Sequence, residues 1–173
     1  MVSMNELGKL FLCSSLLEEK VAKAYEHMSQ LFDNKLIKCL LEFIARDSYK
    51  HARCFELMAK AFSQEVHVNP EDCVKVWGKT WLAAIKSADR ILKKHEIGLS
   101  DIDSLLDELR EIEGFTAEEF LTVLHVKTID LMASEGEVHL DHFKVILNWI
   151  AEDEKRHEKI IEIVKSMILR IVS

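Results

Sequence analysis

Residues 143–164 read FKVILNWIAEDEKRHEKIIEIV, and residues 37–58 read IKCLLEFIARDSYKHARCFELM. Aligned without a gap, at an offset of 106 residues, the two stretches share seven identical residues of 22. In both, apolar residues recur every three or four positions, which is typical of an amphipathic α-helix. Each stretch carries one histidine, His51 or His157, at the centre of its apolar side. The chain therefore contains two related helices, and each one points an imidazole into the core.

The composition favours a helical globular protein. The 173 residues are 49% apolar and 31% charged, with one proline and five glycines, too few for a fold with many turns. This length fits a single all-α domain over residues 1–173. A net charge of −7 argues against a nucleic-acid partner. No apolar run approaches the length of a transmembrane helix, so no membrane partner is expected.

The cysteines predict a reducing compartment. None of the four forms a CxxC pair, and three fall in predicted helix interiors. Buried thiols of this kind are typical of cytoplasmic proteins, so a cytoplasmic location with free cysteines is expected. The four residues are Cys13, Cys39, Cys54 and Cys73.

Four long helices are expected, each with an apolar side at helical spacing. Short turns join the first helix to the second and the third to the fourth. Each pair is therefore expected to be an antiparallel hairpin, the first over about 5–64 and the second over about 115–172. The four helices cover about residues 5–33, 35–64, 116–134 and 139–172.

The segment between the hairpins, about 65–115, differs from them. Asn69 and Pro70 have the sequence of a helix start, with the asparagine as the cap and the proline in the first turn. A helix is expected from there to about His95, and a shorter one from about Ser100 to Gly114. The sequence thus predicts two hairpins that are joined by a long, partly helical crossover.

Further polar side chains are expected to face the core beside the two histidines. Glu154 lies one turn before His157, at the edge of the same apolar side. On the first helix, Glu18 lies on the flank of the apolar side, and Tyr25 shares that flank seven residues later. A buried carboxylate must be paired, bound to a metal or protonated. The first, second and fourth helices therefore each direct at least one polar group inward.

This pattern resembles the ferritin-like superfamily and, within it, the rubrerythrin/erythrin branch. The resemblance rests on Glu18 with Tyr25, on ARDSYKH (45–51) and on AEDEKRH (151–157), which contains a complete ExxH pair. It implies a ferritin-like four-helix bundle of two hairpins with a di-iron carboxylate site in the core. In that site the first and third helices each supply one Glu, and the second and fourth each supply an ExxH pair.

The resemblance also assigns roles to individual residues. It implies metal ligands from the first, second and fourth helices, with Tyr25 as a nearby hydrogen-bond donor. For the third helix two alternatives stay open, because alignment of the repeat favours His125 and the distance from the last turn favours Glu118. The implied ligands of the other three helices are Glu18, His51, Glu154 and His157.

The sequence departs from the family pattern at Ser48, which stands where the second helix should carry its glutamate. Asp47 is adjacent, but it points about 100° away around the helix. Without this carboxylate the site carries less negative charge, and the remaining histidines and carboxylates suit one Fe, Mn or Zn ion. A di-iron site, a mononuclear site and a metal-free hydrogen-bonded core all stay open.

The resemblance implies a rubrerythrin-like metal-binding protein, a peroxide- or dioxygen-reactive oxidoreductase with an altered metal site. Because the chain has no CxxC pair for a rubredoxin-type iron centre, an external protein must donate the electrons. A homodimer or small homo-oligomer is also implied. The alternative is a metal-free ferritin-like scaffold or oligomerisation protein, and whether the protein is an enzyme stays open.

Overall fold

The computed structural model describes residues 3–62, 67–116, 121–135 and 141–172. Within these ranges the chain is all-α, as predicted, with six helices and no strand. No helix in these ranges has both the length and the apolar character needed to cross a membrane. The helices are α1 (Met4–Gln30), α2 (Lys35–Phe62), α3 (Pro70–Leu92), α4 (Leu99–Gly114), α5 (Leu121–Glu135) and α6 (Asp141–Val172).

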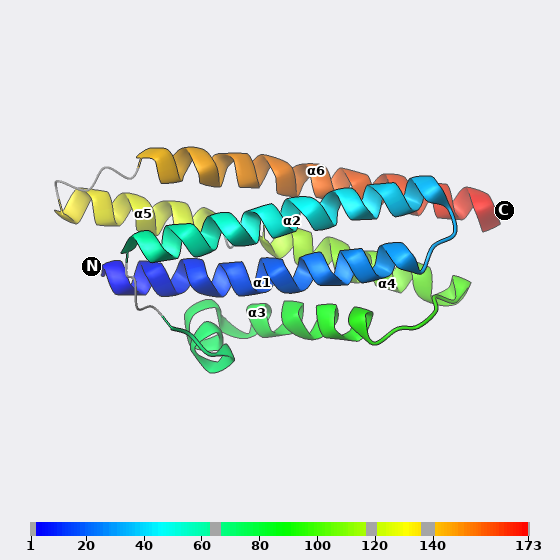
Figure 1. Ribbon diagram of the computed structural model, residues 1–173, viewed down its shortest axis with the longest axis horizontal. Helices are drawn as coiled ribbons and strands as arrows, with labels where there is room; N and C mark the ends of the chain where they lie inside the picture. Colours follow the sequence, from blue (N-terminus) through cyan, green and yellow to red (C-terminus); the bar gives the residue numbers. More distant parts are fainter. Residues whose placement is uncertain (1–2, 63–66, 117–120, 136–140, 173) are drawn as a thin grey trace.

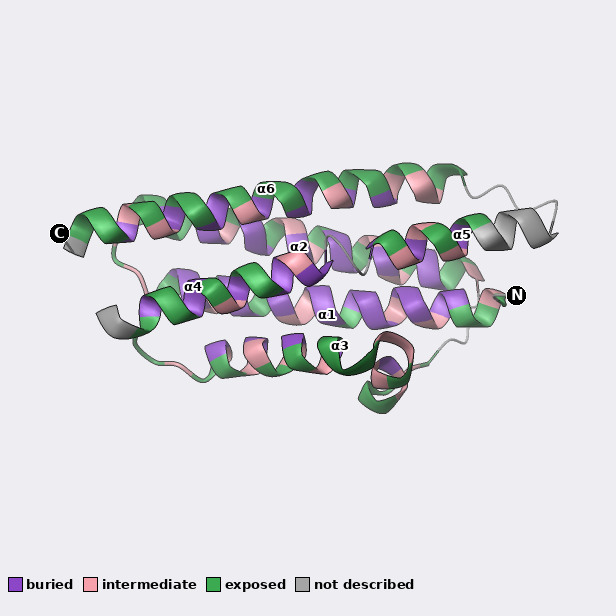
Figure 2. Cartoon of the chain, turned by 180° about the vertical axis from the view of Figure 1, so that it is seen from behind, coloured by how far each residue is buried: buried purple, intermediate pink, exposed green. Residues whose placement is uncertain are grey.

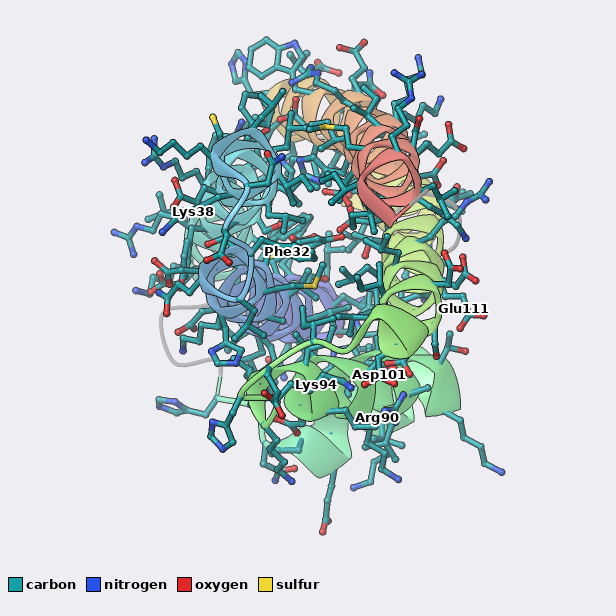
Figure 3. All side chains as sticks on the ribbon, turned by 90° about the vertical axis from the view of Figure 1, so that its right-hand side faces the viewer. Phe32, Lys38, Arg90, Lys94, Asp101 and Glu111 are labelled. Atoms are coloured by element: carbon teal, nitrogen blue, oxygen red, sulfur yellow. A yellow bond between two sulfur atoms is a disulfide. The ribbon has the colours of Figure 1, made fainter. Side chains whose placement is uncertain are left out.

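The helices run along a common long axis (Figure 1). The helices α1 and α2 form an antiparallel hairpin, and α6 packs beside α2 with the opposite direction. The helices α4 and α5 follow one another in the same direction, and both contact α6. Seen along the axis, α1, α2, α4 and α6 surround an interior filled with side chains, and α3 lies outside, against α1 and α4 (Figure 3).

Local hydrogen bonds explain where three helices begin. Ser3 and Glu6 form a reciprocal capping box at the start of α1. Before α2, the side-chain oxygen of Asn34 accepts hydrogen bonds from two backbone N–H groups of the first turn. Asn69 and Asp72 form a second capping box at the start of α3, with proline in the first turn. The predicted cap at Asn69 is thereby confirmed.

Each helix turns its apolar side to the shared core, as the alternation of buried and exposed surface in Figure 2 shows. Aromatic rings stack near one end of this core, where α1, α2 and α6 meet. They are Phe11, Phe55, Phe62 and Phe143.

The third of the four expected long helices differs from the expectation. One long helix was expected over 116–134, after a crossover that ended at about 115. The described part of that helix is α5, and residues 117–120 lie outside the described ranges. The preceding helix α4 does not stay in the crossover but packs on α6, because it buries an apolar side of its own. That side consists of Ile102, Leu105, Leu106, Leu109 and Ile112.

A disulfide joins Cys13 on α1 to Cys73 on α3. Both cysteines are fully buried, whereas Cys39 is exposed and Cys54 is half-buried, and both of these are free. The expectation of four free thiols was therefore wrong for Cys13 and Cys73. Sequence spacing could not pair them, because 60 residues separate them and only the packing of α3 on α1 brings them together.

Two indole rings attach α3 to the same part of α1. The Nε1–H of Trp81 donates to the backbone oxygen of Cys13 at 3.1 Å, and that of Trp77 donates to Leu10 at 3.4 Å. Between them, Gly78 has φ 76° and ψ −165°, which breaks α3 into two segments of different direction. This backbone conformation is open only to glycine, and it allows both tryptophans to reach α1.

Candidate metal centre

Five acidic and histidine side chains from four helices meet in the middle of the core. Each has 2% or less of its surface exposed. Burial of this many ionisable groups is costly unless they are paired with one another or bind a cation. They are Glu18 on α1, His51 on α2, Glu113 on α4, and Glu154 and His157 on α6.

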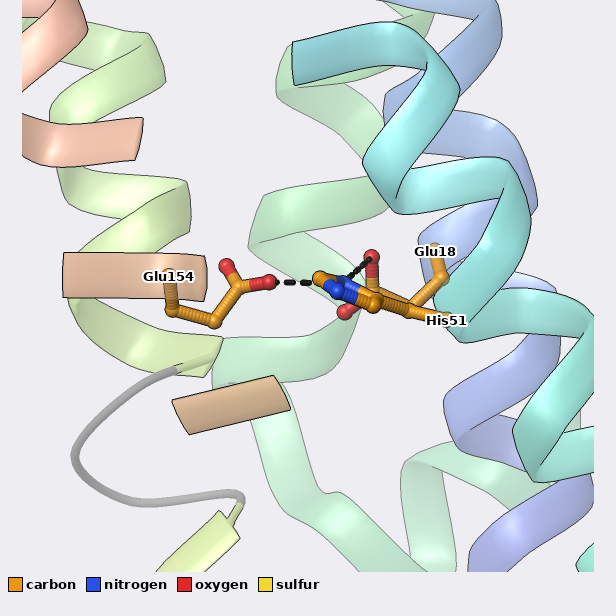
Figure 4. Close-up of side chains that lie close together, drawn as sticks. All are labelled: Glu18, His51 and Glu154. Carbon is orange, nitrogen blue, oxygen red and sulfur yellow. Dashed lines mark ion pairs between the residues drawn. The ribbon is translucent and has the colours of Figure 1, made fainter. Parts of the chain in front are cut away.

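The first group consists of Glu18, His51 and Glu154, and one ligand atom of each lies within 4.8 Å of the other two. The Nδ1 atom of His51 lies 2.9 Å from Oε1 of Glu154 and 3.8 Å from Oε2 of Glu18. Figure 4 shows the imidazole between the two carboxylates. Such a trio of donor atoms could hold a metal ion.

The second group consists of Glu113, Glu154 and His157, under the same 4.8 Å criterion. The Nδ1 atom of His157 lies 3.1 Å from Oε2 of Glu113 and 3.7 Å from Oε1 of Glu154. Glu154 therefore belongs to both groups. Its Oε1 atom is the oxygen that lies near both histidines.

Several polar atoms of this centre have no hydrogen-bond partner among the described residues, although they are fully buried. The Nδ1 atom of His51 is one of them, although it lies 2.9 Å from Oε1 of Glu154 as an ion pair. Buried polar groups without partners are rare in folded proteins, so each one needs an explanation. The atoms are Oε1 of Glu18, Glu113 and Glu154, Nδ1 of His51 and the hydroxyl oxygen of Tyr25.

The outer nitrogen of each histidine is held by an aspartate of the opposite helix. The Nε2 atom of His51 lies 3.1 Å from Asp153 on α6, and that of His157 lies 3.4 Å from Asp47 on α2. If each aspartate accepts the Nε2 proton, Nδ1 of the same ring is left free to act as a ligand. The two aspartates therefore fix the direction in which each imidazole can coordinate.

Surface cations complete this arrangement. The Nζ atom of Lys50 lies 2.8 Å from Asp47 and 2.9 Å from Asp153. Arg156, the equivalent residue of the repeat, lies 2.8 Å from the other oxygen of Asp153. Because both cations are about half exposed, they neutralise the aspartates at the boundary between core and solvent.

The crowded charges shift the pKa values of the buried groups. Burial alone would lower the pKa of His51, but Glu154 and Glu18 outweigh it and raise that pKa to about 10. Burial also opposes protonation of His157, and Glu113 and Glu154 raise its pKa to about 11. Burial, with repulsion from Glu18 and Glu113, raises the pKa of Glu154 to about 8. Without a metal, protons thus neutralise part of the charge in this centre.

Tyr25 lies beside the same carboxylates. Burial, then the negative charge of Glu113, Glu154 and Glu18, raises the pKa of its phenol well above the usual value. The phenol therefore keeps its proton at neutral pH and can donate a hydrogen bond into the centre. The donor role that the family resemblance implied for Tyr25 stays a prediction.

The structure brings together four of the candidate ligands that the sequence suggested. Glu18, His51, Glu154 and His157 all lie in the centre. His125 is half-buried on α5 and belongs to neither group, and Glu118 lies outside the described residues. A carboxylate of α4, Glu113, lies in the second group instead, although its residue was expected to belong to the crossover.

One residue of the centre, Glu113, and the two aspartates that contact its histidines were not expected to take part, although the sequence carried a signal for each. Asp47 and Asp153 are identical in the repeat and stand four residues before the two histidines. Glu113 follows Leu109 by four residues and Leu106 by seven, which places it on the apolar side of α4.

No family model, curated protein or solved structure matches this chain. The interpretation of the centre therefore depends on its own donor atoms. Imidazole nitrogens and carboxylate oxygens are donor atoms that Fe, Mn and Zn accept in proteins.

Proposed function

We propose that this protein is a ferritin-like metalloprotein related to rubrerythrin, with two divalent metal ions in its core and iron as the expected metal. The observation that carries this proposal is the set of buried, unpartnered donor atoms from Glu18, His51, Glu113 and Glu154. Two cations would provide these atoms with partners and would offset the repulsion among three buried carboxylates.

Each ion would have one histidine and one carboxylate of its own. Glu18 and His51 would hold the first, Glu113 and His157 the second, and Glu154 would bridge them. Asp153 and Asp47 would orient the two imidazoles through their outer nitrogens. This assignment extends the expected four-ligand set by Glu113 and favours a dinuclear site over a mononuclear one.

The proposed fold is a ferritin-like four-helix bundle whose third helix is interrupted. The helices α1, α2 and α6 would be three of its members, and α4 with α5 would form the fourth. In this interpretation α3 is the crossover, attached outside the bundle by the disulfide and the two tryptophans.

The proposed activity is that of a peroxide- or dioxygen-reactive oxidoreductase. Bound iron would supply the redox chemistry. The protein would contribute buried surroundings with little water, the hydrogen-bond donor Tyr25 and histidines whose outer nitrogens contact aspartates. The chain contains no CxxC pair, so the electrons would come from a second protein. A homodimeric state remains part of the proposal.

Metal content provides the first test. The protein is purified without chelators or an affinity tag, loaded anaerobically with Fe(II), desalted and analysed for metals. We expect about two ions per chain, because the centre holds two groups of ligands that share one carboxylate. The double variant His51→Ala/His157→Ala is expected to lose both ions.

The matched control is His95→Ala/His142→Ala, which removes two exposed histidines outside the core. This variant should bind as much metal as the wild-type protein. A wild-type protein that holds no iron, manganese or zinc after loading would overturn the proposal and favour the metal-free scaffold. If two ions bind, consumption of hydrogen peroxide by the reduced protein tests the activity.

A further inference from the structure

The candidate metal centre has an approximate two-fold symmetry that one residue breaks. His51 corresponds to His157, and Asp47 to Asp153, at the offset of the sequence repeat. Glu18 and Glu113 take equivalent places beside the two histidines, one from α1 and one from α4. Glu154 should likewise have a counterpart, but the residue at that position of α2 is Ser48.

Ser48 occupies the same place on its helix as Glu154 does on α6. Each stands three residues before its histidine, and each is buried, with 1% and 2% of its surface exposed. A serine side chain is shorter than a glutamate side chain by about the size of a carboxylate group. The α2 side of the centre therefore presents a hydroxyl group where the symmetry requires a bridging carboxylate.

The charge of the centre is unbalanced as a result. Glu18, Glu113 and Glu154 together supply three negative charges, fewer than two divalent ions require. The aspartates do not correct this difference, because Lys50 and Arg156 already pair with them. A centre with two divalent ions would retain one uncompensated positive charge in a buried place, which is unfavourable.

We propose that a small carboxylate from solution, of the size of formate or acetate, binds beside Ser48 and takes the place of the missing glutamate. The second metal ion then binds more tightly together with this anion than without it. This inference rests on the proposed function, because it requires a centre that binds metal. It assigns to Ser48 the role of leaving one bridging position to an outside ligand.

The anion and the second metal ion should strengthen each other's binding, and this mutual effect can be measured. If formate strengthens binding of the second metal ion, that ion must strengthen binding of formate by the same factor. Coupling between two ligands commonly changes the affinity by about 5–150-fold.

An anaerobic titration with Co(II) tests this inference, because the visible spectrum of Co(II) reports its coordination. The titration is done once in sodium formate and once in sodium chloride at equal ionic strength.

The wild-type protein is expected to bind one Co(II) tightly in both salts, and the second at least about 5-fold more tightly in formate. Ser48→Ala should behave as the wild type does, because it also leaves the position free. Ser48→Glu should bind two ions equally well in both salts, because its own carboxylate fills the position. Circular dichroism verifies that each variant is folded.

The outcomes separate this inference from the proposed function. If the wild-type protein binds two ions with the same affinity in chloride and formate, the inference is overturned while the proposed function stands. The same holds if Ser48→Glu folds and keeps the formate effect. If the wild-type protein binds no metal in either salt, both are overturned. If Ser48→Glu does not fold, the formate effect in the wild type and in Ser48→Ala still decides.

Discussion

His51 and His157 face each other in the core with ring centroids 5.8 Å apart, and each is anchored by the aspartate that precedes the other. Asp153 and His157 belong to the same helix, yet Asp153 binds His51 on the opposite helix. Likewise, Asp47 belongs to the same helix as His51 but binds His157 on the opposite helix. Helices α2 and α6 thus each carry one of the two histidines and the aspartate that contacts the histidine of the other helix, so the two halves of the centre depend on each other.

Loss of an orienting aspartate should weaken metal binding without removing a ligand. Asp153→Asn keeps the size of the side chain but removes the charge that holds the outer nitrogen of His51. Substitutions of this kind commonly lower metal affinity by about 10–100-fold. Competition with a coloured chelator measures the affinity, and Glu152→Gln, at the exposed neighbouring position, is the control. Equal affinities in the two variants would exclude an orienting role for Asp153.

The shared carboxylate should matter more than the unshared one. Glu113→Gln removes a ligand from one group only, so this variant is expected to keep about one metal ion per chain, out of two in the wild type. Glu154→Gln removes a ligand from both groups and should weaken both ions. Elemental analysis after desalting distinguishes the two cases. Retention of two ions by Glu113→Gln would show that this carboxylate is not a ligand.

The sequence predicted those parts of the structure that depend on local patterns. The apolar spacing located α1, α2 and α6, and the Asn-Pro pair located the start of α3. The sequence also suggested four of the five residues of the centre, because each lies on the apolar side of its own helix. Helical spacing determines on which side of its helix a side chain lies, and its burial follows from that.

The sequence could not predict which residues of different helices contact one another. Asp47 does point away from the direction of His51 on its own helix, but its partner is His157 on α6. Glu113 was missed for a related reason. The offset of 106 residues holds for α2 and α6. On the third helix it pointed to His125, next to the exact counterpart of Glu18, whereas the structure brings Glu113 into the centre from α4. Pairing across helices depends on packing, which a single offset does not describe.

The disulfide should stabilise the attachment of α3. Cys13→Ala/Cys73→Ala removes a crosslink between residues 60 positions apart, and closing a loop of this length restricts the unfolded chain. We expect a loss of about 2–4 kcal/mol in the free energy of unfolding. Denaturation in urea measures it. The control Cys39→Ala/Cys54→Ala removes the two free thiols and should change little. Equal stability of the two variants would contradict a structural role for the disulfide.

Gly78 should resist substitution for a reason of backbone conformation alone. A Cβ atom at this position would meet nothing within 4 Å, but φ of 76° is strained for any residue with a side chain. Gly78→Ala is therefore expected to cost about 1–3 kcal/mol of folding free energy. Gly114→Ala is the matched control, because its Cβ would make an ordinary contact at 3.8 Å and no positive φ is involved. Thermal denaturation of the two variants should separate them, and an unaffected Gly78→Ala would contradict this account.

The metal-free protein should lose stability as the pH rises from 7 to 9. The pKa of His51 is about 10 and that of His157 about 11 in the folded chain, against 6.5 for an unperturbed histidine. Folded protein therefore keeps protons that the unfolded chain releases, and this stabilisation is complete below about pH 6.5 and lost towards pH 10–11. Each histidine contributes at most about 1.4 kcal/mol per pH unit in this window.

Glu154 adds to this slope up to about pH 8, because its raised pKa makes the folded chain bind that proton more tightly as well. Asp153 acts in the acid range: because its pKa is lowered from 3.8 to about 2, its stabilisation is complete above about pH 3.8 and is lost as the pH falls towards 2. Urea denaturation in the presence of a chelator measures the slope, with His51→Gln/His157→Gln as the comparison. The double variant should show a much flatter dependence between pH 7 and 9. Metal binding requires neutral imidazole, so a metal-loaded protein should instead gain stability as the pH rises, and a common slope for all three samples would contradict the proposed charge balance.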